Sequence, residues 1–423
     1  MRNTHINHPV SRGRSPLTNL KTKLILLTSE FPFGKGETFL ENEFPFLVKE
    51  FEQIMIFTES KKEESRINYS NVQVHLIPSI NLKSRISSLF NKEFYRELNY
   101  LRKLGKFNLT TFRTAWYSLA KAINIAEQLE SLDNKESSLF YSYWLDEKAL
   151  ALALLKLRNP SLKAISRAHG WDVYEERHPN KYLPYRNLLA KNLDSVYTIS
   201  QNGNLYLSDR YPLMKAKLIV NRLGTMPLVS LPEKLKSDSI HILSISSIIP
   251  LKRVDKILEV VSSIPTNKIK WTHIGNGSEF EKIKELTIRN AEKNPNFSFE
   301  LLGQLTNPEV RDILSRHYFD FFINLSETEG IPVTIMEAQS AGIPVLATNV
   351  GGTSEIVNNE NGFLVEKEFN LEDVVSIIQK YLSSTDEEKQ RKRNASYNNW
   401  KQHYNAETNY KEFVKLYLSA EDR

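Results

Sequence analysis

The chain has 423 residues, with 56 Lys and Arg against 50 Asp and Glu, and no cysteine. The missing cysteine excludes disulfides, zinc–thiolate sites, iron–sulfur clusters and a thiol nucleophile, and it fits a reducing cytoplasm. The length predicts two or three domains, and the 40% hydrophobic and 25% charged residues are typical of a soluble globular protein. A net charge of +6 and a pI near 9.0 indicate an anionic partner: a nucleotide, a nucleic acid or a membrane surface.

Residues 1–20 are expected to form a floppy basic lead-in, because Arg2, Arg12 and Arg14 stand there without an apolar run long enough for a signal peptide. No later apolar run approaches the roughly 20 residues of a membrane-spanning helix. Short runs rich in β-branched and aromatic residues then predict buried strands, separated by longer helical patterns. The runs of the first half are 23–28, 53–58, 72–77, 139–143, 163–168, 196–199 and 218–220.

A second series of strand-like runs comprises 241–246, 270–274, 298–302, 320–325 and 344–347. Alternation of strands and helices predicts parallel sheets with helices on both faces, and hence two doubly wound α/β domains, residues 21–225 and 240–399, that meet at a cleft. Residues 226–239, with two prolines and a polar cluster, are the predicted linker. Aromatic residues at helical spacing predict a closing helix in residues 400–423 that packs across the domains.

Two carboxylates mark the carboxyl end of one predicted strand. Glu329 stands in the loop after the strand 320–325, and Glu337 stands early in a helix that Pro332 begins and Gly342 ends. Such a pair can bind sugar or ribose hydroxyls, because each carboxylate accepts two charge-assisted hydrogen bonds from a diol. The alternative is that both are solvated glutamates, favoured there by the helix dipole.

Two further places favour an anion. Gly351 and Gly352 lie between a strand and a Ser/Thr helix start, where free amides suit a diphosphate; the alternative is an ordinary capped turn. Lys252 and Arg253 follow the first strand of the second half. A cation there could neutralise the charge on a departing phosphate, and the alternative is a surface basic pair.

The first half contributes a histidine and a glycine loop. His169 directly follows the strand 163–168 and would face the cleft, although a lone histidine is more often structural. Gly34 and Gly36, after the first strand, let the backbone approach a ligand closely, and Glu37 lies near the next helix start.

Other chemistries lack their motifs. There is no Walker loop, and the glycine loops carry Phe39 and Phe280 where a dinucleotide fingerprint has its third glycine. Neither His-Glu-x-x-His nor Asp-x-Asp occurs, so the sequence indicates no dedicated metal site.

These blocks together resemble retaining glycosyltransferase family 4 (glycosyl transferases group 1), over nearly the whole chain from about Leu24 to about Tyr417. The most specific match is the motif of two glutamates with seven residues between them, Glu329 and Glu337. The other matching blocks are Phe31-Pro-x-Gly-x-Gly-Glu37, Arg167-x-His169-Gly-x-Asp172-x-Tyr174-Glu175-Glu176-Arg177, Pro250-x-Lys252-Arg253 and Gly351-Gly352-x-x-Glu355.

The resemblance implies a GT-B fold and a set of roles. Glu337 would hold the nucleotide ribose, Glu329 the donor sugar and Lys252 the diphosphate, while His169 would help to stabilise the charged transition state. Other implied nucleotide-sugar contacts are Gly34, Gly36, Arg253, Ser247, Gly330, Ile331, Pro332, Val333, Gly351 and Gly352. Glu37 and Asp172 would lie on the acceptor side. Ser247 stands where many members carry an Arg. Either Arg253, which we favour, or a first-domain arginine such as Arg222 compensates, or the leaving group is stabilised less strongly.

The predicted function is retaining, metal-independent transfer of a hexosyl unit from a UDP- or GDP-sugar, without a cofactor. The acceptor would be a saccharide or lipid-linked saccharide in cell-surface polysaccharide biosynthesis, and the protein would be cytoplasmic. A sugar-nucleotide epimerase or glycosyl phosphorylase on the same fold is one alternative. A non-catalytic basic binder of membrane or nucleic acid is another.

Residues 81–121 concentrate the positive charge, with nine Lys and Arg against two acids and with aromatic residues between them. Three interpretations stay open: an ordinary helix pair, a surface for anionic lipid or a lipid-linked acceptor at the inner face of the plasma membrane, and a nucleic-acid site. The last lacks a recognised module, and no nucleic-acid partner is expected.

Overall fold

The computed structural model describes residues 23–34, 36–60, 64–133, 135–234, 239–265 and 268–419. The lead-in predicted for residues 1–20, the last residues of the chain and part of the predicted linker, residues 235–238, lie outside the described residues. Lys35, between the two glycines of the first loop, does so too.

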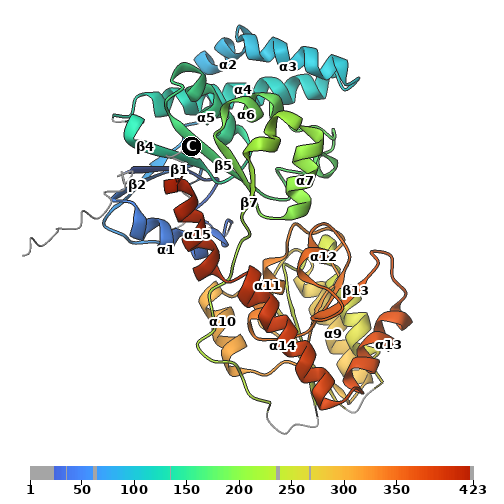
Figure 1. Ribbon diagram of the computed structural model, residues 1–423. Coiled ribbons are helices and arrows are strands. Elements are labelled where there is room, and N and C mark those ends of the chain that lie inside the picture. Colours follow the sequence, from blue (N-terminus) through green and yellow to red (C-terminus); the bar gives the residue numbers. More distant parts are fainter. Residues whose placement is uncertain are drawn as a thin grey trace, which may run out of the picture.

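The first domain is built on a seven-stranded parallel sheet in the order β3-β2-β1-β4-β5-β6-β7 (Figure 1). Its strands are β1 (Lys23–Leu27), β2 (Gln53–Thr58), β3 (Val72–Leu76), β4 (Ser138–Ser142), β5 (Lys163–Ala168), β6 (Ser195–Thr198) and β7 (Leu218–Val220). The helices and short 3-10 turns are α1 (Leu40–Glu50), α2 (Leu82–Leu89), α3 (Lys92–Lys103), α4 (Leu109–Glu130), η1 (Lys135–Ser137), α5 (Glu147–Arg158), η2 (Glu175–Arg177), α6 (Arg186–Asn192), α7 (Gln201–Arg210) and η3 (Pro212–Lys217).

The second domain repeats the plan with six parallel strands in the order β10-β9-β8-β11-β12-β13. They are β8 (Ile240–Ile245), β9 (Ile269–Ile274), β10 (Phe297–Leu301), β11 (Phe321–Asn324), β12 (Val345–Thr348) and β13 (Gly362–Val365). Its helices are η4 (Pro250–Lys252), α8 (Val254–Ser262), α9 (Phe280–Lys293), α10 (Asn307–Arg316), α11 (Val333–Ser340), α12 (Thr353–Ile356), α13 (Leu371–Leu382) and α14 (Asp386–His403). The sequence pattern does not predict β13, because only three apolar residues follow Gly362.

Helices cover both faces of each sheet, which explains why central strands such as β1 and β2 are buried along almost their whole length, whereas the edge strands β3 and β10 carry exposed polar residues. In β1, Leu24 and Leu26 pack with α1, while Ile25 and Leu27 pack with α4 and α5 on the opposite face. Both strand orders reverse direction beside their first strand, at β1–β4 and at β8–β11. The predicted pair of doubly wound α/β domains is therefore confirmed.

The chain passes between the domains at two adjacent places. Thr225, on the way out of the first domain, forms a bridge with Asn405, where the chain returns. Trp400 at the end of α14 donates its indole N–H to the Thr225 hydroxyl at 2.8 Å. Gly224 is required here, because a Cβ on it would lie 2.6 Å from the backbone of Ala406.

The last helix, α15 (Ala406–Ser419), belongs to the first domain although it follows the second (Figure 1). Phe413 is fully buried beside β1 and β4, and the Arg167 guanidinium lies 4.1 Å from its ring centroid. Arg167 also pairs with the buried Glu43 of α1 at 3.0 Å. This cluster ties the last helix to the first sheet.

Candidate active site

Loops that follow the carboxyl ends of both sheets contact each other between the domains. In an open parallel sheet, ligands bind at this end, beside the position where the strand order reverses. Gly170, after β5, lies against Gly330, after β11: a Cβ on Gly170 would be only 3.1 Å from the Gly330 Cα. The candidate site is built from these loops.

Lys252 and Glu329 meet within the second domain. Lys252 closes η4 after β8, and its Nζ lies 2.6 Å from Glu329 Oε1. Asn324, the last residue of β11, donates to the same oxygen at 3.3 Å. Glu329 is nearly buried, with 8% of its surface exposed. The structure thus brings together the two residues predicted to hold the diphosphate and the donor sugar.

Glu337 lies on α11. This helix begins at Val333, and Ile331 and Pro332 directly precede it. The helix is buried from Ile335 to Ser340, so the carboxylate is taken out of water with it. Burial raises the pKa of Glu337 to about 7, and Arg311 offsets only part of that rise. Its carboxylate accepts no hydrogen bond from the described residues. A hydroxyl donor brought by a ligand would supply what the protein does not.

His169 sits in an aromatic box. Its ring centroid lies 4.5 Å from Trp144, 4.9 Å from Tyr143 and 5.4 Å from Phe39. The side chain is buried, yet neither ring nitrogen has a hydrogen-bond partner among the described residues, and Nδ1 is 4.0 Å from Asp172. Buried polar atoms are nearly always paired, so two unpaired nitrogens in one ring point to a ligand.

Other unpaired polar atoms stand around the same loops. The hydroxyl oxygens of Ser246, Ser326 and Thr353, which follow β8, β11 and β12, are buried without a partner in the described part of the chain, as is that of Tyr143 beside His169. Sequence reasoning did not find these hydroxyls, because Ser and Thr are common in any loop.

Arg177 reaches the site from the first domain. Its guanidinium donates to the Glu329 carbonyl, and no carboxylate among the described residues forms an ion pair with it. Two glycines make room for it: a Cβ on Gly170 would lie 2.5 Å from its Nη1, and one on Gly351 would lie 3.4 Å from its Nη2. Half-burial lowers the pKa of Arg177, an effect that Tyr174, Glu329 and Asp172 oppose.

The turn Gly351–Gly352 lies at a domain contact, where the side-chain amide of Asn202 on α7 donates to the Gly351 carbonyl at 3.4 Å. Gly352 donates its N–H to the Gly330 carbonyl at 2.7 Å, and the helix that follows, α12, has only four residues. Glu355 accepts the backbone N–H groups of Gln201 and Asn202, each at 2.7 Å, at the start of α7. The amides that the sequence assigned to a diphosphate are thus partly used within the protein.

The carboxylates of Glu37 and Asp172 accept hydrogen bonds from backbone N–H groups and do not face solvent. Glu37 is buried and accepts N–H groups from Ser29, Glu30 and Phe31 at 2.7–2.9 Å, and from the Trp144 indole at 2.5 Å. Asp172 accepts the N–H groups of His169 at 2.5 Å and of Leu145 at 2.7 Å. Both carboxylates fix the loops that carry His169 and its aromatic box.

The glycine loop is anchored by a residue that the sequence did not single out. Arg66 donates to the carbonyls of Phe33 and Gly36, at 3.1 and 2.8 Å. Gly34 has a left-handed φ of 63°, and Gly36 donates its N–H to the Glu30 carboxylate at 3.0 Å. Arg66 lies some thirty residues from the loop, so no local pattern reveals its role.

Arg253 does not join Lys252. Its guanidinium is held by Glu327 at 3.3 Å, by the carbonyl of Lys367 at 2.7 Å and by Glu368 at 3.3 Å. Ser247 is exposed in the loop after β8, and Arg222 lies 3.8 Å from Glu355. Neither arginine that was expected to compensate for Ser247 contacts the Lys252–Glu329 pair.

A cavity of about 360 Å³ opens in the first domain next to these loops. Trp144, Asp146 and Asp172 line it beside the His169 loop, and Thr114 and Ser118 of α4 line another part. Trp171, which also lines it, is 58% exposed and packs on His178 at 4.4 Å. Exposed aromatic faces and carboxylates are the groups that bind saccharides.

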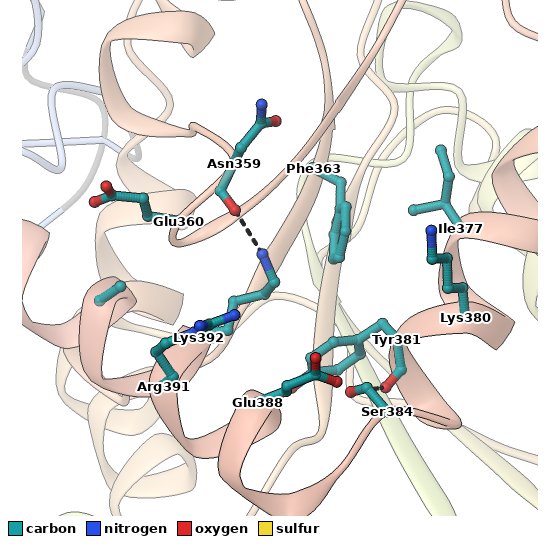
Figure 2. Close-up of a pocket in the computed structure, with 11 residues that line it drawn as sticks. Asn359, Glu360, Phe363, Ile377, Lys380, Tyr381, Ser384, Glu388, Arg391 and Lys392 are labelled. Atoms are coloured by element: carbon teal, nitrogen blue, oxygen red, sulfur yellow. Dashed lines mark hydrogen bonds between the residues drawn. The ribbon is translucent and has the colours of Figure 1, made fainter.

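A second hollow, of about 680 Å³, lies between β13, α13 and α14. Figure 2 shows Phe363 and Tyr381 along it, and the Lys392 ammonium donating to the Asn359 carbonyl at 2.7 Å. None of the residues predicted from the sequence to be functional lines this hollow. It is therefore separate from the candidate site.

No group of three His, Asp or Glu side chains is arranged to hold a metal ion within the described ranges. In the same ranges, no helix is long and apolar enough to cross a membrane.

Comparisons with known proteins add to this geometry. Residues 231–398 match the family model Glycosyl transferases group 1. An uncharacterized glycosyltransferase of Methanocaldococcus jannaschii is 27% identical over 82% of this chain and 84% of its own. The O-antigen biosynthesis glycosyltransferase WbnH of Escherichia coli is 27% identical over 48% of this chain and 56% of its own. HepE of Anabaena, solved in complex with UDP-glucose, shares the fold with a TM-score of 0.63 at 14% identity, covering 94% of this chain and 99% of HepE.

Both of these sequence relatives are named as glycosyltransferases, and the architecture shared with HepE is that of two facing doubly wound domains. The alternative of a non-catalytic binder is therefore wrong. The chain is a glycosyltransferase with the GT-B fold, and it contains a glycosyl transferases group 1 domain in residues 231–398.

Proposed function

We propose that this protein transfers a hexosyl unit from a UDP- or GDP-sugar to a saccharide or lipid-linked saccharide, with retention of the anomeric configuration and without a metal. We place the reaction in the cytoplasm, in the biosynthesis of a cell-surface polysaccharide. The UDP-glucose bound by HepE and the O-antigen pathway of WbnH support the donor class and the pathway. The observation that carries the proposal is the buried His169, whose ring nitrogens have no partner in the described chain and whose neighbour Gly170 lies against Gly330, next to Glu329.

The donor would bind polar groups of two kinds. Lys252 and Glu329 now pair with each other, and the Glu337 carboxylate has no hydrogen-bond partner in the described chain. Ribose hydroxyls would donate to Glu337, whose carboxylate has no partner in the described chain. The diphosphate would take Lys252 away from Glu329, which frees that carboxylate to accept sugar hydroxyls. Exchange of this kind replaces one charge-assisted contact by another, so that neither charge is left unpaired.

Transfer breaks the bond between C1 of the sugar and the diphosphate oxygen and forms one between C1 and the acceptor oxygen, while the proton of the acceptor hydroxyl passes to the departing diphosphate. Negative charge grows on the diphosphate and positive charge on the sugar ring. Lys252 would stabilise the negative charge on the diphosphate. Asp172 holds the loop that orients His169. The ring nitrogens of His169 would bind a sugar hydroxyl and so place a polar group beside the positive charge on the sugar ring.

Arg177 would be the second cation on the diphosphate. It would replace the arginine that many family members carry at the position of Ser247. It is half-buried, has no carboxylate partner in the described chain and touches the carbonyl of Glu329. Because it comes from the first domain, it would complete the site only when the domains are closed. The acceptor saccharide would occupy the cavity lined by Trp144, Asp146 and Trp171.

The test begins with thermal shifts against UDP-, GDP- and ADP-sugars, since a ligand that binds the native state raises its melting temperature. The donor found in this way is then incubated with candidate acceptors, with and without EDTA, and the product is examined by NMR. We expect an anomer like that of the donor, turnover in EDTA and loss of turnover in His169→Ala. An inverted product would contradict retention, rescue by manganese after EDTA would contradict metal independence, and sugar interconversion without acceptor would indicate an epimerase.

A further inference from the structure

The helices α2, α3 and α4 lie on the side of the first domain away from the second domain (Figure 1). The face that they form combines exposed apolar and basic side chains. We call it the α2–α4 face; it comprises α2, α3, the turn after α3 and the first turns of α4, residues 82–117. Its exposed large apolar residues are Leu82, Ile86, Phe90, Tyr95, Leu104, Phe107, Leu109 and Tyr117.

The apolar exposure is large and ordered. Phe90 is 80% exposed, Leu82 72% and Leu109 64%. Leu82, Ile86 and Phe90 recur at every fourth residue, so they form one ridge along α2. A soluble monomer rarely leaves such a group of large side chains in water unless a partner covers it.

The acidic side chains of the same face are buried. Its only acids are Glu93 and Glu97, and both are buried. Glu97 accepts hydrogen bonds from the Tyr182 hydroxyl at 2.6 Å and the Tyr185 N–H at 2.8 Å, while Glu93 pairs with Arg96. The exposed surface between residues 82 and 117 therefore presents no carboxylate.

Five cations of the face are free to meet an anionic partner. None of them forms an ion pair with a carboxylate among the described residues, whereas Lys83 is paired with Glu127 and Lys106 with Glu175. Arg102 packs over the ring of Phe107 at 4.8 Å, which keeps an aromatic and a cation at one spot. The five are Arg85, Lys92, Arg102, Lys103 and Arg113.

We propose that the α2–α4 face docks on an anionic lipid bilayer, with Leu82, Ile86 and Phe90 inserted at the headgroup boundary and the free cations on the lipid headgroups. A bilayer surface accepts apolar side chains and cations at the same depth, which is how amphipathic helices bind it. A nucleic acid would match the cations but would leave the aliphatic ridge of α2 in water.

Docking would also place the acceptor, an extension that rests on the proposed function. Thr114 and Ser118, which line the 360 Å³ cavity, adjoin the exposed Arg113 and Tyr117 on α4. The cavity and the face thus share one helix. A lipid-linked saccharide could place its sugar in the cavity while its lipid stays in the bilayer.

Flotation with vesicles tests the docking directly. The full chain is mixed with vesicles of 30% phosphatidylglycerol in phosphatidylcholine, or of phosphatidylcholine alone, and we expect binding only to the first. The variant with Arg85, Lys92, Arg102 and Lys103 changed to Gln should bind more than about tenfold more weakly, since each cation near an anionic surface contributes measurably. Leu82→Ser with Phe90→Ser should weaken binding at high salt, where the charge contribution is screened.

The matched control changes four exposed cations of the second domain and α14, Lys284, Arg289, Arg391 and Lys401, to Gln, which gives the same net charge. It should bind like the unchanged chain. Equal loss in the control and the test variant, equal binding to both vesicle types, or preference for a DNA oligonucleotide over the vesicles would overturn the proposal. Melting curves of the variants and their thermal shift with the donor sugar nucleotide report folding and donor binding separately, so failure of the docking is distinguishable from failure of the proposed function.

Discussion

Lys252 and Glu329 neutralise each other across the loops that follow β8 and β11, with 2.6 Å between the ammonium nitrogen and the carboxylate oxygen. The pair joins two residues that the proposed function assigns to different parts of one donor. A structural ion pair and a pair that exchanges its partners for a ligand respond differently when one member is removed.

Lys252→Ala should lower kcat by a factor on the order of 10²–10³, because it removes a cation from the leaving diphosphate. Glu329→Gln should instead raise KM for the donor and reduce kcat less, because the amide still binds hydroxyls. Steady-state kinetics with the identified donor separate the two. Full turnover in Lys252→Ala would remove this residue from the mechanism.

Glu337 predicts a pH dependence whose sign follows from burial. Its pKa is raised to about 7, so the folded chain binds more protons than the unfolded chain between the ordinary glutamate pKa and about 7. This carboxyl therefore makes folding less favourable as pH rises through that range. Glu337→Gln should melt at a higher temperature than the unchanged chain at pH 8, by a stability difference of a few kcal/mol, and at a similar temperature at pH 4.

The same substitution should weaken donor binding. Ionised Glu337 accepts two ribose hydroxyls, so donor affinity of the unchanged chain should rise as pH increases through about 7, and the rise should be absent in Glu337→Gln. Calorimetric titration with the donor nucleotide at pH 6 and pH 8 checks this. A variant that is less stable and binds normally would show that Glu337 is only a structural residue.

Arg177 and Arg253 form a natural comparison, since Arg177 contacts the Glu329 carbonyl and Arg253 pairs with the nearby Glu327, but only Arg177 lacks a carboxylate partner in the described chain. Arg177→Gln should lower kcat about 10–100-fold with little change in melting temperature, and Arg177→Lys should restore part of it. Arg253→Gln should leave kcat within about threefold of the unchanged chain. The reverse order of effects would assign the second cation to Arg253.

Glu37 should matter for stability more than for acceptor recognition. Glu37→Gln leaves at least one of its four N–H donors without an acceptor, which should cost about 2–4 kcal/mol of unfolding free energy by urea titration. Glu30→Gln, which removes a carboxylate with one backbone contact from the same loop, is the control and should cost less than about 1 kcal/mol. A change in acceptor KM at unchanged stability would favour the acceptor-side role.

The apolar runs predict the sheets well, because central strands such as β1 and β2, covered on both faces by helices, are apolar along most of their length. The edge strand β13 escapes this rule, being only partly covered and having three apolar residues after Gly362. Motif spacing brings out Glu329, Glu337, Lys252 and His169, since three of them stand shortly after strand ends and Glu337 lies on the helix that follows Glu329. It does not reveal Arg66 or the aromatic box around His169, because those contacts join segments far apart in the chain. Arg177 lies in a matching block, but only the two glycines beside its guanidinium show where it points.

The side-by-side passage of the chain at Thr225 and Asn405 has a mechanical consequence. Two chain connections far apart would restrict rotation of one domain against the other. Two adjacent connections allow rotation about a single hinge axis. Rotation about that line would part Arg177 from Glu329 and Gln201 from Glu355 together. Any side chain at Gly224 would collide with the Ala406 backbone at this hinge, so a substitution there should change domain opening and product release more than the chemical step.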